Sequence, residues 1–175
     1  MSRFVPLIVV AALVALFLGM MLSDRNPNEI DSVLIGREAP EFSLASLDDA
    51  SPALTQADLS TGKPVLVNFF ASWCVPCRAE HENLMRLAGD YRVEVIGIAY
   101  KNEKDQAIGF LNELGNPFSK TGLDLDGRVG IDWGVSGVPE TFLIDGDGIV
   151  RYRHWGPIVG DSLETRLLPE LEALR

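Results

Sequence analysis

The sequence predicts an α/β fold in which helices flank a central mixed sheet. Two nearly continuous apolar runs rich in β-forming residues, 65–70 and 93–99, are typical of strands buried on both faces. Helical patterns at residues 76–88 and 104–114 follow these runs, and this order predicts a parallel βαβ unit. A hairpin signal later in the chain adds antiparallel strands, so the sheet is expected to be mixed.

An apolar segment precedes this fold. The run from Phe4 to Leu22 carries no charged residue. A helix of about 19 residues rises about 28 Å, close to the thickness of the hydrocarbon core of a bilayer. We therefore predict a transmembrane anchor over residues 1–22, with the rest of the chain outside. A cleaved signal peptide is the alternative, but residues 19–23 lack the alternating small residues that cleavage favours.

The rest of the chain divides into a linker and one domain. Residues 23–33 are polar and contain Asn-Pro-Asn, which predicts a linker. Residues 34–175 have the length of a single domain. Because 47% of all residues are hydrophobic, this domain is expected to bury its core without structural disulfides.

Before the βαβ unit, the domain is expected to begin with a short strand. Residues 42–44 alternate as a strand does, and a turn-rich stretch with a helical turn near Asp58 follows. After the βαβ unit, residues 116–137 are rich in glycine and aspartate. They predict irregular structure with one helical turn at 128–132.

The C-terminal part closes the domain. Residues 141–144 and 149–153 predict strands joined by an Asp-Gly-Asp-Gly hairpin turn. Leucines at helical spacing predict a last helix over residues 162–174. Pro169 is expected to bend or interrupt that helix.

Charge excludes several classes of partner. The formal net charge is −10 and the isoelectric point is near 4.6. So acidic a chain is a poor ligand for phosphate backbones, which excludes nucleic acid. It also lacks a dense basic cluster for anionic lipid. The acidity is interpreted as a contribution to solubility.

Two cysteines carry the chemistry. Cys74 and Cys77 are the only cysteines in the chain, and they form a CxxC motif between a predicted strand and a predicted helix. The helix N-terminus lowers the pKa of the Cys74 thiol, because its free N–H groups and positive dipole end favour the thiolate. Cys77, one turn later and more buried, is expected to resolve a mixed disulfide. Trp73 is expected to shield the sulfurs, and Pro76 to stiffen the helix start.

The sequence predicts no metal site and no cofactor. Zinc requires about four ligands, and beyond the two thiols the chain offers only His81 and His154, which are expected at surface or packing positions. Attachment of c-type haem requires histidine directly after the second cysteine, where Arg78 stands. Residues 124–127 and 145–148 begin as calcium loops do but lack the later ligands, so both predict turns.

Several motifs carry a family resemblance. The segment 65–77, Val-Leu-Val-Asn-Phe-Phe-Ala-Ser-Trp-Cys-Val-Pro-Cys, resembles the active-site strand and helix of the thioredoxin superfamily. The finer resemblance is to the membrane-anchored, TlpA-like thiol:disulfide interchange proteins of cytochrome c maturation, the DsbE/CcmG type. It implies a thioredoxin-like fold with an N-terminal strand extension and an insertion near residues 116–137. The motifs that carry it are at residues 73–81, 114–117, 137–145 and 151–154.

The resemblance also implies roles around the thiols. Val138-Pro139 resembles a cis-proline loop, which would present the backbone of Val138 to an extended substrate alongside the sulfurs; otherwise Pro139 only starts a strand. Trp73 is expected to contact the substrate as well. Asn68 stands where thioredoxin has a buried, proton-handling aspartate. Glu80 and Glu140 are the acids expected to take over that task. The alternative makes Glu80 a solvated helix residue and Glu140 a turn residue.

The expected function is reduction of protein disulfides by an enzyme in the inner membrane, single-pass, with its domain in the periplasm. The resemblance implies apocytochrome c, with its CxxCH motif, or a maturation protein as substrate, and a membrane electron donor of the DsbD or CcdA type. One alternative is a general periplasmic oxidoreductase or isomerase without haem-pathway specificity. Another is a non-catalytic copper carrier or haem-handling module that uses the CxxC as ligand.

Overall fold

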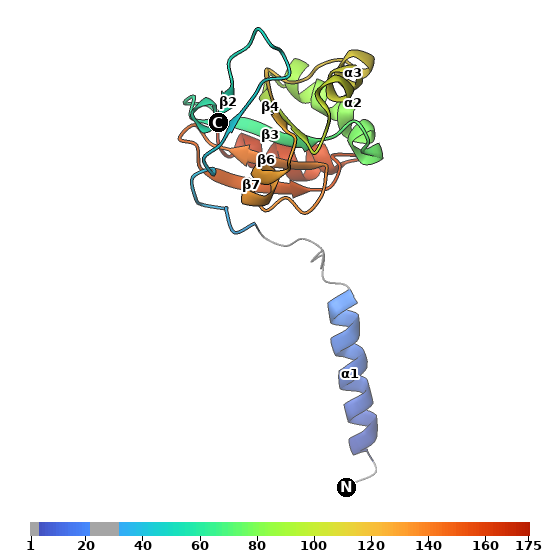
Figure 1. Cartoon of the computed structure of the whole chain (residues 1–175). Coiled ribbons are helices and arrows are strands. Elements are labelled where there is room, and N and C mark those ends of the chain that lie inside the picture. Colours follow the sequence, from blue (N-terminus) through green and yellow to red (C-terminus); the bar gives the residue numbers. More distant parts are fainter. Residues whose placement is uncertain (1–3, 22–31) are drawn as a thin grey trace. The chain divides into compact units, whose positions relative to one another are not determined.

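The structure, a computed structural model, describes residues 4–21 and 32–175 (Figure 1). The chain divides into two units, residues 1–30 and residues 31–175. In the N-terminal unit, helix α1, Val5–Met21, has no charged residue. Among the described residues, no helix combines the length and the apolar character that crossing a membrane requires. Most of the predicted linker, residues 23–31, lies outside the described residues.

A five-stranded mixed sheet forms the centre of the folded unit, and the prediction of such a sheet is confirmed (Figure 1). Its strand order is β5-β4-β3-β6-β7. The first three of these strands are parallel, whereas β6 is antiparallel to both of its neighbours. The strands are β3 Val65–Phe70, β4 Glu94–Tyr100, β5 Lys120–Asp124, β6 Glu140–Ile144 and β7 Val150–Trp155.

Every residue of β3 is buried, because the core lies on both faces of the sheet. Side chains of a strand alternate between the faces, so Leu66 and Phe70 join one core and Val67 and Phe69 join the other. The first core packs under α2, Val75–Gly89; α3, Lys104–Leu114; and the C-terminal helical segment. The elements that contribute to the second core include β1 Ser43–Leu44, β2 Leu54–Thr55, η1 Gln56–Leu59 and α4 Arg128–Asp132.

Strand β5 corrects the prediction of irregular structure over residues 116–137. The predicted helical turn is present as α4, but residues 120–124 pair with β4 as a parallel edge strand. The segment Lys-Thr-Gly-Leu-Asp has few β-forming residues, so its local pattern resembles a loop. The packing of β5 favours glycine at position 122, because a Cβ atom there would lie 3.0 Å from atoms of Leu44 and Leu54.

The last helix is interrupted where Pro169 predicts. Leu163–Leu167 form a π-helical turn, η2, and Leu168–Glu172 form the short helix α5. Proline has no N–H to continue a helical hydrogen-bond ladder, so the wider turn before it is the expected local response. Leu163, Leu167 and Leu171 are buried in the first core, which keeps the interrupted segment on the sheet.

Candidate active site

Cys74 is the N-cap of helix α2, directly after the loop that leaves β3. Its sulfur is bonded to that of Cys77 in a disulfide, with the two Cα atoms 5.3 Å apart. The backbone N–H of Cys77 donates to Sγ of Cys74 at 3.1 Å. This donor and the helix dipole both favour negative charge on that sulfur. Cys74 and Cys77 are 3% and 2% exposed, so the predicted contrast in their burial is not seen in the disulfide form.

The loop before β6 lies against the Cys74 sulfur. The Val138–Pro139 peptide is cis, as predicted. Sγ of Cys74 lies 3.5 Å from the carbonyl oxygen of Val138. A pocket of about 250 Å³ opens beside this contact, between Pro76, residues 136–139 and residues 155–157. The pocket is large enough for one side chain of a bound segment.

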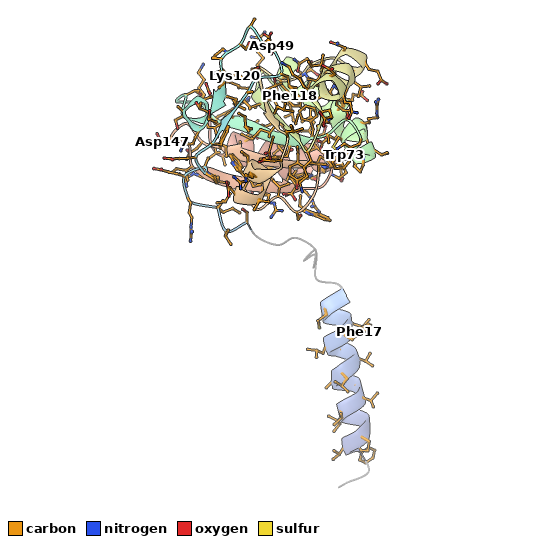
Figure 2. All side chains as sticks on the ribbon, viewed as in Figure 1. Phe17, Asp49, Trp73, Phe118, Lys120 and Asp147 are labelled. Atoms are coloured by element: carbon orange, nitrogen blue, oxygen red, sulfur yellow. A yellow bond between two sulfur atoms is a disulfide. The ribbon has the colours of Figure 1, made fainter. Side chains whose placement is uncertain are left out.

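Trp73 lies at the surface of the folded unit (Figure 2), where 58% of the residue is exposed. Its indole N–H donates to the carbonyl oxygen of Lys101 at 3.1 Å. This bond ties the ring to the end of β4. The neighbouring Val75 is 77% exposed, so apolar surface lies next to the disulfide.

Glu80 is completely buried on α2, one helical turn after Cys77. The alternative of a solvated helix residue is therefore wrong. Its Oε1 accepts from Nδ2 of Asn68 at 2.9 Å, and its Oε2 accepts from the backbone N–H of Ile158 at 2.9 Å. Burial raises the pKa of Glu80 to about 7, against the effect of both hydrogen bonds. A carboxyl with that pKa can release and take up a proton near neutral pH.

Glu140 is also completely buried, but its contacts differ. Its Oε1 accepts from the N–H and the hydroxyl of Ser136, at 2.9 and 2.7 Å, and from the N–H of Gly137 at 3.3 Å. Its Oε2 pairs with the guanidinium of Arg153, at 2.6 Å. Glu140 thus fixes the loop that leads to Pro139. Its contribution to proton exchange stays a prediction.

Two more residues of the 73–81 motif connect α2 to its surroundings. Arg78 pairs with Glu113 on α3 through two hydrogen bonds of 2.8 and 2.9 Å. His81 is 4% exposed, and its Nε2 lies 3.0 Å from the carbonyl oxygen of Gly115. Burial lowers the pKa of His81. These contacts hold the active-site helix against α3 and the residue that follows it.

Sequence reasoning missed three residues of the site: Ser136, Thr141 and Arg153. Thr141 accepts from Nδ2 of Asn68 at 2.9 Å. The side chain of Arg153 is 8% exposed and pairs with Glu140, and Ser136 also accepts from the indole N–H of Trp155 at 3.0 Å. Arg153 lies within a predicted strand that pairs with the strand of Glu140. An arginine at such a position, across from a candidate buried acid, is a signal that could have identified it.

The aspartates of the two glycine-rich segments have backbone partners. Asp145 accepts from the N–H groups of Asp147 and Ile149 and pairs with Arg151. Asp124 accepts from the N–H groups at the start of α4. Across residues 4–21 and 32–175, no three His, Cys, Asp or Glu side chains are grouped to hold a metal ion. Residues 145–148 form a turn, as predicted, whereas in the other segment Asp124 ends β5 and residues 125–127 form the bend that leads to α4.

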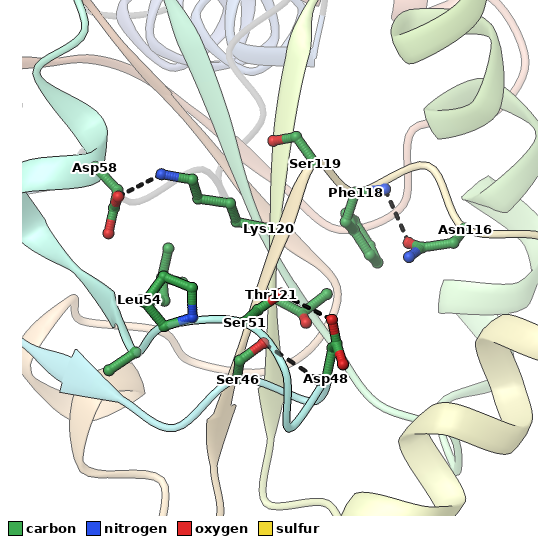
Figure 3. Close-up of a pocket in the computed structure, with 12 residues that line it drawn as sticks. Ser46, Asp48, Ser51, Leu54, Asp58, Asn116, Phe118, Ser119, Lys120 and Thr121 are labelled. Atoms are coloured by element: carbon green, nitrogen blue, oxygen red, sulfur yellow. Dashed lines mark hydrogen bonds and ion pairs between the residues drawn. The ribbon is translucent and has the colours of Figure 1, made fainter.

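A second pocket, of about 280 Å³, lies beside the start of β5 (Figure 3). In its wall, Lys120 pairs with Asp58, and Oδ1 of Asn116 accepts from the N–H of Phe118. The side chain of Asp48 accepts from Ser51 in the loop between β1 and β2. No thiol lines this pocket. The redox site is therefore the region around Cys74 and Cys77.

Comparison with known proteins identifies relatives of this chain. Residues 34–167 match the Redoxin family model. The chain is 43% identical to the thiol:disulfide interchange protein DsbE of Yersinia pestis over 95% of this chain and 89% of that protein. It is 45% identical to HelX, a thiol:disulfide interchange protein of Rhodobacter capsulatus, over 96% of this chain and 94% of that protein.

A solved structure agrees with the fold. A secreted disulfide oxidoreductase of Mycobacterium tuberculosis, described as homologous to E. coli DsbE, superimposes with a TM-score of 0.63. It is 25% identical in sequence, and the match covers 76% of this chain and 96% of that chain. The thioredoxin-like α/β fold predicted from the motifs is thus confirmed.

Proposed function

Because this chain belongs to the redoxin family, among the thiol:disulfide interchange proteins of the DsbE type, it is a thiol-disulfide oxidoreductase, and we propose that it reduces substrate disulfides during cytochrome c maturation. The observation that carries the proposal is the Cys74–Cys77 disulfide at the start of α2, beside the Val138 carbonyl. In the proposed reaction, the reduced form of this pair gives two electrons to the substrate.

The reaction proceeds in two exchange steps. The Cys74 thiolate attacks one sulfur of the substrate disulfide, so that the substrate S–S bond breaks and a mixed disulfide forms. The sulfur that leaves takes up a proton. The Cys77 thiolate then attacks Sγ of Cys74, which closes the Cys74–Cys77 disulfide and releases the second substrate sulfur as a thiol. The enzyme is oxidised by two electrons and the substrate is reduced by two.

The proposed roles of the two cysteines follow from their positions. Sγ of Cys74 receives the N–H of Cys77 and lies at the helix N-terminus, so its thiolate is stabilised and is also a good leaving group. Cys77 lies within the helix, where its attack on Cys74 needs only a short movement. Loss of its proton is the step that requires a base.

Glu80 is the base that the geometry favours. It lies one turn after Cys77 on the same helix, is buried, and has a pKa raised to about 7. A base with a pKa near the ambient pH is suited to transfer protons in both directions. Glu140 contributes by fixing residues 136 and 137 before Pro139. This places the Val138 carbonyl beside the sulfur where a substrate strand would pair.

The proposed substrate segment is extended and carries a disulfide. It would pair with the backbone of Val138 and place one neighbouring side chain in the pocket between Pro76 and Trp155. The CxxCH segment of an apocytochrome c fits this description, as does a cysteine pair of a maturation protein. A membrane-bound dithiol donor, of the DsbD or CcdA type, would return two electrons to the Cys74–Cys77 disulfide.

We also propose that the N-terminal segment keeps the enzyme at the inner membrane, with the folded unit in the periplasm. Residues 4–22 have no charge, and α1, Val5–Met21, would rise about 26 Å at 1.5 Å per residue. Such an anchor would keep the Cys74–Cys77 disulfide within reach of an electron donor in the same membrane.

A trapping experiment tests the proposed reaction. In C77S, the first exchange step remains possible but the mixed disulfide cannot be resolved. This variant should accumulate substrate bound covalently to Cys74, and mass spectrometry should find a CxxCH segment or a maturation protein. C74S, the matched control, should trap nothing. If C77S traps nothing and holocytochrome c still forms in cells that carry only C77S, the proposal is wrong; a broad set of unrelated proteins would instead indicate a general oxidoreductase.

A further inference from the structure

Asn68 is a completely buried amide on β3, the strand that leads to Cys74. Its Nδ2 donates to Oε1 of Glu80 and to Oγ1 of Thr141, each at 2.9 Å. Both hydrogens of the amide nitrogen are therefore used. The Oδ1 atom of the same amide, by contrast, has no hydrogen-bond partner within the described part of the chain.

An unpartnered buried carbonyl oxygen destabilises a protein, because it gives up hydrogen bonds to water and receives none in return. Turning the amide by about 180° exchanges its nitrogen and its oxygen. Oδ1 would then face Glu80 and Thr141, where it can accept from a protonated carboxyl and from a rotated Thr141 hydroxyl. Nδ2 would in turn lose its partners. The proton on Glu80 therefore decides which orientation has the lower energy.

We propose that Asn68 is a positioning residue for proton transfer by Glu80, with one amide orientation for the carboxylate and the other for the carboxylic acid. This inference rests on the proposed function, since the Glu80 proton matters only while the Cys74–Cys77 pair turns over. An amide that serves both forms keeps the carboxyl in one place as its proton leaves and returns.

The surroundings of Glu80 leave this task to Asn68. The loop after β7 contributes the Ile158 N–H, which cannot change roles. On α2, Cys77 lies one turn earlier and is held in the disulfide. Glu140, on β6, is paired with arginine. Among the described residues, burial raises the pKa of Glu80, its hydrogen bonds with Asn68 and Ile158 lower it, and no charged side chain contributes.

The proximity of Glu80 also explains why a carboxylate is unsuitable at position 68. An aspartate at 68 would place two buried carboxyls about 2.9 Å apart, the present distance from Nδ2 of Asn68 to Oε1 of Glu80. Such a pair shares one proton and titrates in two widely separated steps. Asparagine avoids this coupling, so Glu80 titrates as a single group.

Infrared titration of the oxidised full-length protein tests the inference. The carbonyl band that appears on protonation and is absent in E80Q reports Glu80. In N68L the carboxylate loses a charge-assisted hydrogen bond and the carboxylic acid loses a weaker neutral one, so the midpoint of this band should rise by about one pH unit, the difference between the two. T141V removes the other partner of the amide in both orientations, so its midpoint should stay close to that of the wild type.

N68D provides a second test that keeps the shape of the side chain, in case N68L does not fold. Its carboxyl bands should titrate in two steps, one below and one above the wild-type midpoint. An unchanged single midpoint in N68L, or in N68D where only that variant folds, overturns the inference. That result would leave the proposed function standing as long as C77S still traps substrate, whereas failed trapping would remove the proposed function itself.

Discussion

At the residue scale, the two buried acids of the site differ in what surrounds them. Glu140 is paired with Arg153 and accepts three hydrogen bonds from the loop before Pro139. Within residues 4–21 and 32–175, Glu80 accepts from two neutral donors, so desolvation dominates and raises its pKa to about 7. The first acid is suited to hold a loop and the second to exchange a proton.

The raised pKa of Glu80 makes stability depend on pH. Between the ordinary pKa of 4.5 and the folded value of about 7, the folded protein keeps a proton that the unfolded chain releases. Raising the pH through this window therefore lowers the free energy of unfolding, by about 3 kcal/mol in total at 1.36 kcal/mol per unit. E80Q should lose this dependence. Between pH 4.5 and pH 8, the unfolding free energy measured by urea titration should therefore fall by about 3 kcal/mol less in E80Q than in the wild type.

Comparing E80Q with the wild type separates the contribution of Glu80 from those of other titrating groups. The lowered pKa of His81 acts in the opposite direction, since it removes stability as the pH falls, but it is common to both proteins. E82Q makes the same substitution at an exposed position of α2 and should keep the wild-type pH dependence. A wild-type-like slope in E80Q would mean that Glu80 is not the group responsible.

Sequence reasoning located the acids but not their partners. Helical spacing places Glu80 one turn after Cys77, and the resemblance named both Glu80 and Glu140. The pairing of Glu140 with Arg153, by contrast, depends on the register of β6 and β7 and on how the chain enters the Pro139 loop. Local sequence does not contain that information, because strand register is fixed by packing across the sheet.

At the element scale, prediction succeeded where local pattern and tertiary environment agree. Buried strands β3 and β4 and helix α3 have strong periodic or apolar signals, and their boundaries were predicted within one residue. Strands β2 and β5 were missed, since each is held by its neighbours more than by its own composition. In β5, Gly122 weakens the local β signal, yet the packing of Leu44 on this strand requires it.

The requirement at Gly122 can be tested by adding one methyl group. In G122A the new Cβ would lie 3.0 Å from atoms of Leu44 and Leu54, inside normal contact distance. We expect a loss of about 1–3 kcal/mol in unfolding free energy, the usual cost of overpacking. Urea titration at constant pH measures it.

Gly109, in α3, is the matched control for this prediction. A Cβ at Gly109 would meet no atom within 4 Å. Because alanine is the better helix former, G109A should raise the unfolding free energy by about 0.5–1 kcal/mol. Opposite signs for the two Gly→Ala changes would support the packing argument. Equal or greater stability of G122A would show that the two leucines can move aside at no cost.

At the scale of the whole molecule, a net negative charge is combined with a redox site that has exposed apolar surface beside it. The chain carries a formal net charge of −10. The cysteine pair is flanked by exposed apolar surface at Trp73 and Val75, and the carbonyl oxygen of Val138 lies 3.5 Å from Sγ of Cys74. In the proposed function, these short-range contacts would accept any extended segment with a disulfide, whereas the long-range field would distinguish substrates by their charge.

If the long-range field selects substrates by charge, the enzyme should prefer cationic disulfides, and this preference should depend on salt. At low ionic strength the net charge of −10 should concentrate a cation near the protein and repel an anion. The rate constant of the reduced enzyme should therefore be larger for cystamine, a cationic disulfide, than for dithiodiglycolate, an anionic one. Dithiothreitol, a small uncharged dithiol, gives the reference ratio of these two rate constants, and the ratio for the enzyme should exceed it. Since the Debye length falls from about 30 Å at 0.01 M to about 3 Å at 1 M, stopped-flow rates should show this excess shrink severalfold with added salt. A ratio independent of salt would mean that local charges at the site, and not the field of the whole protein, select the substrate.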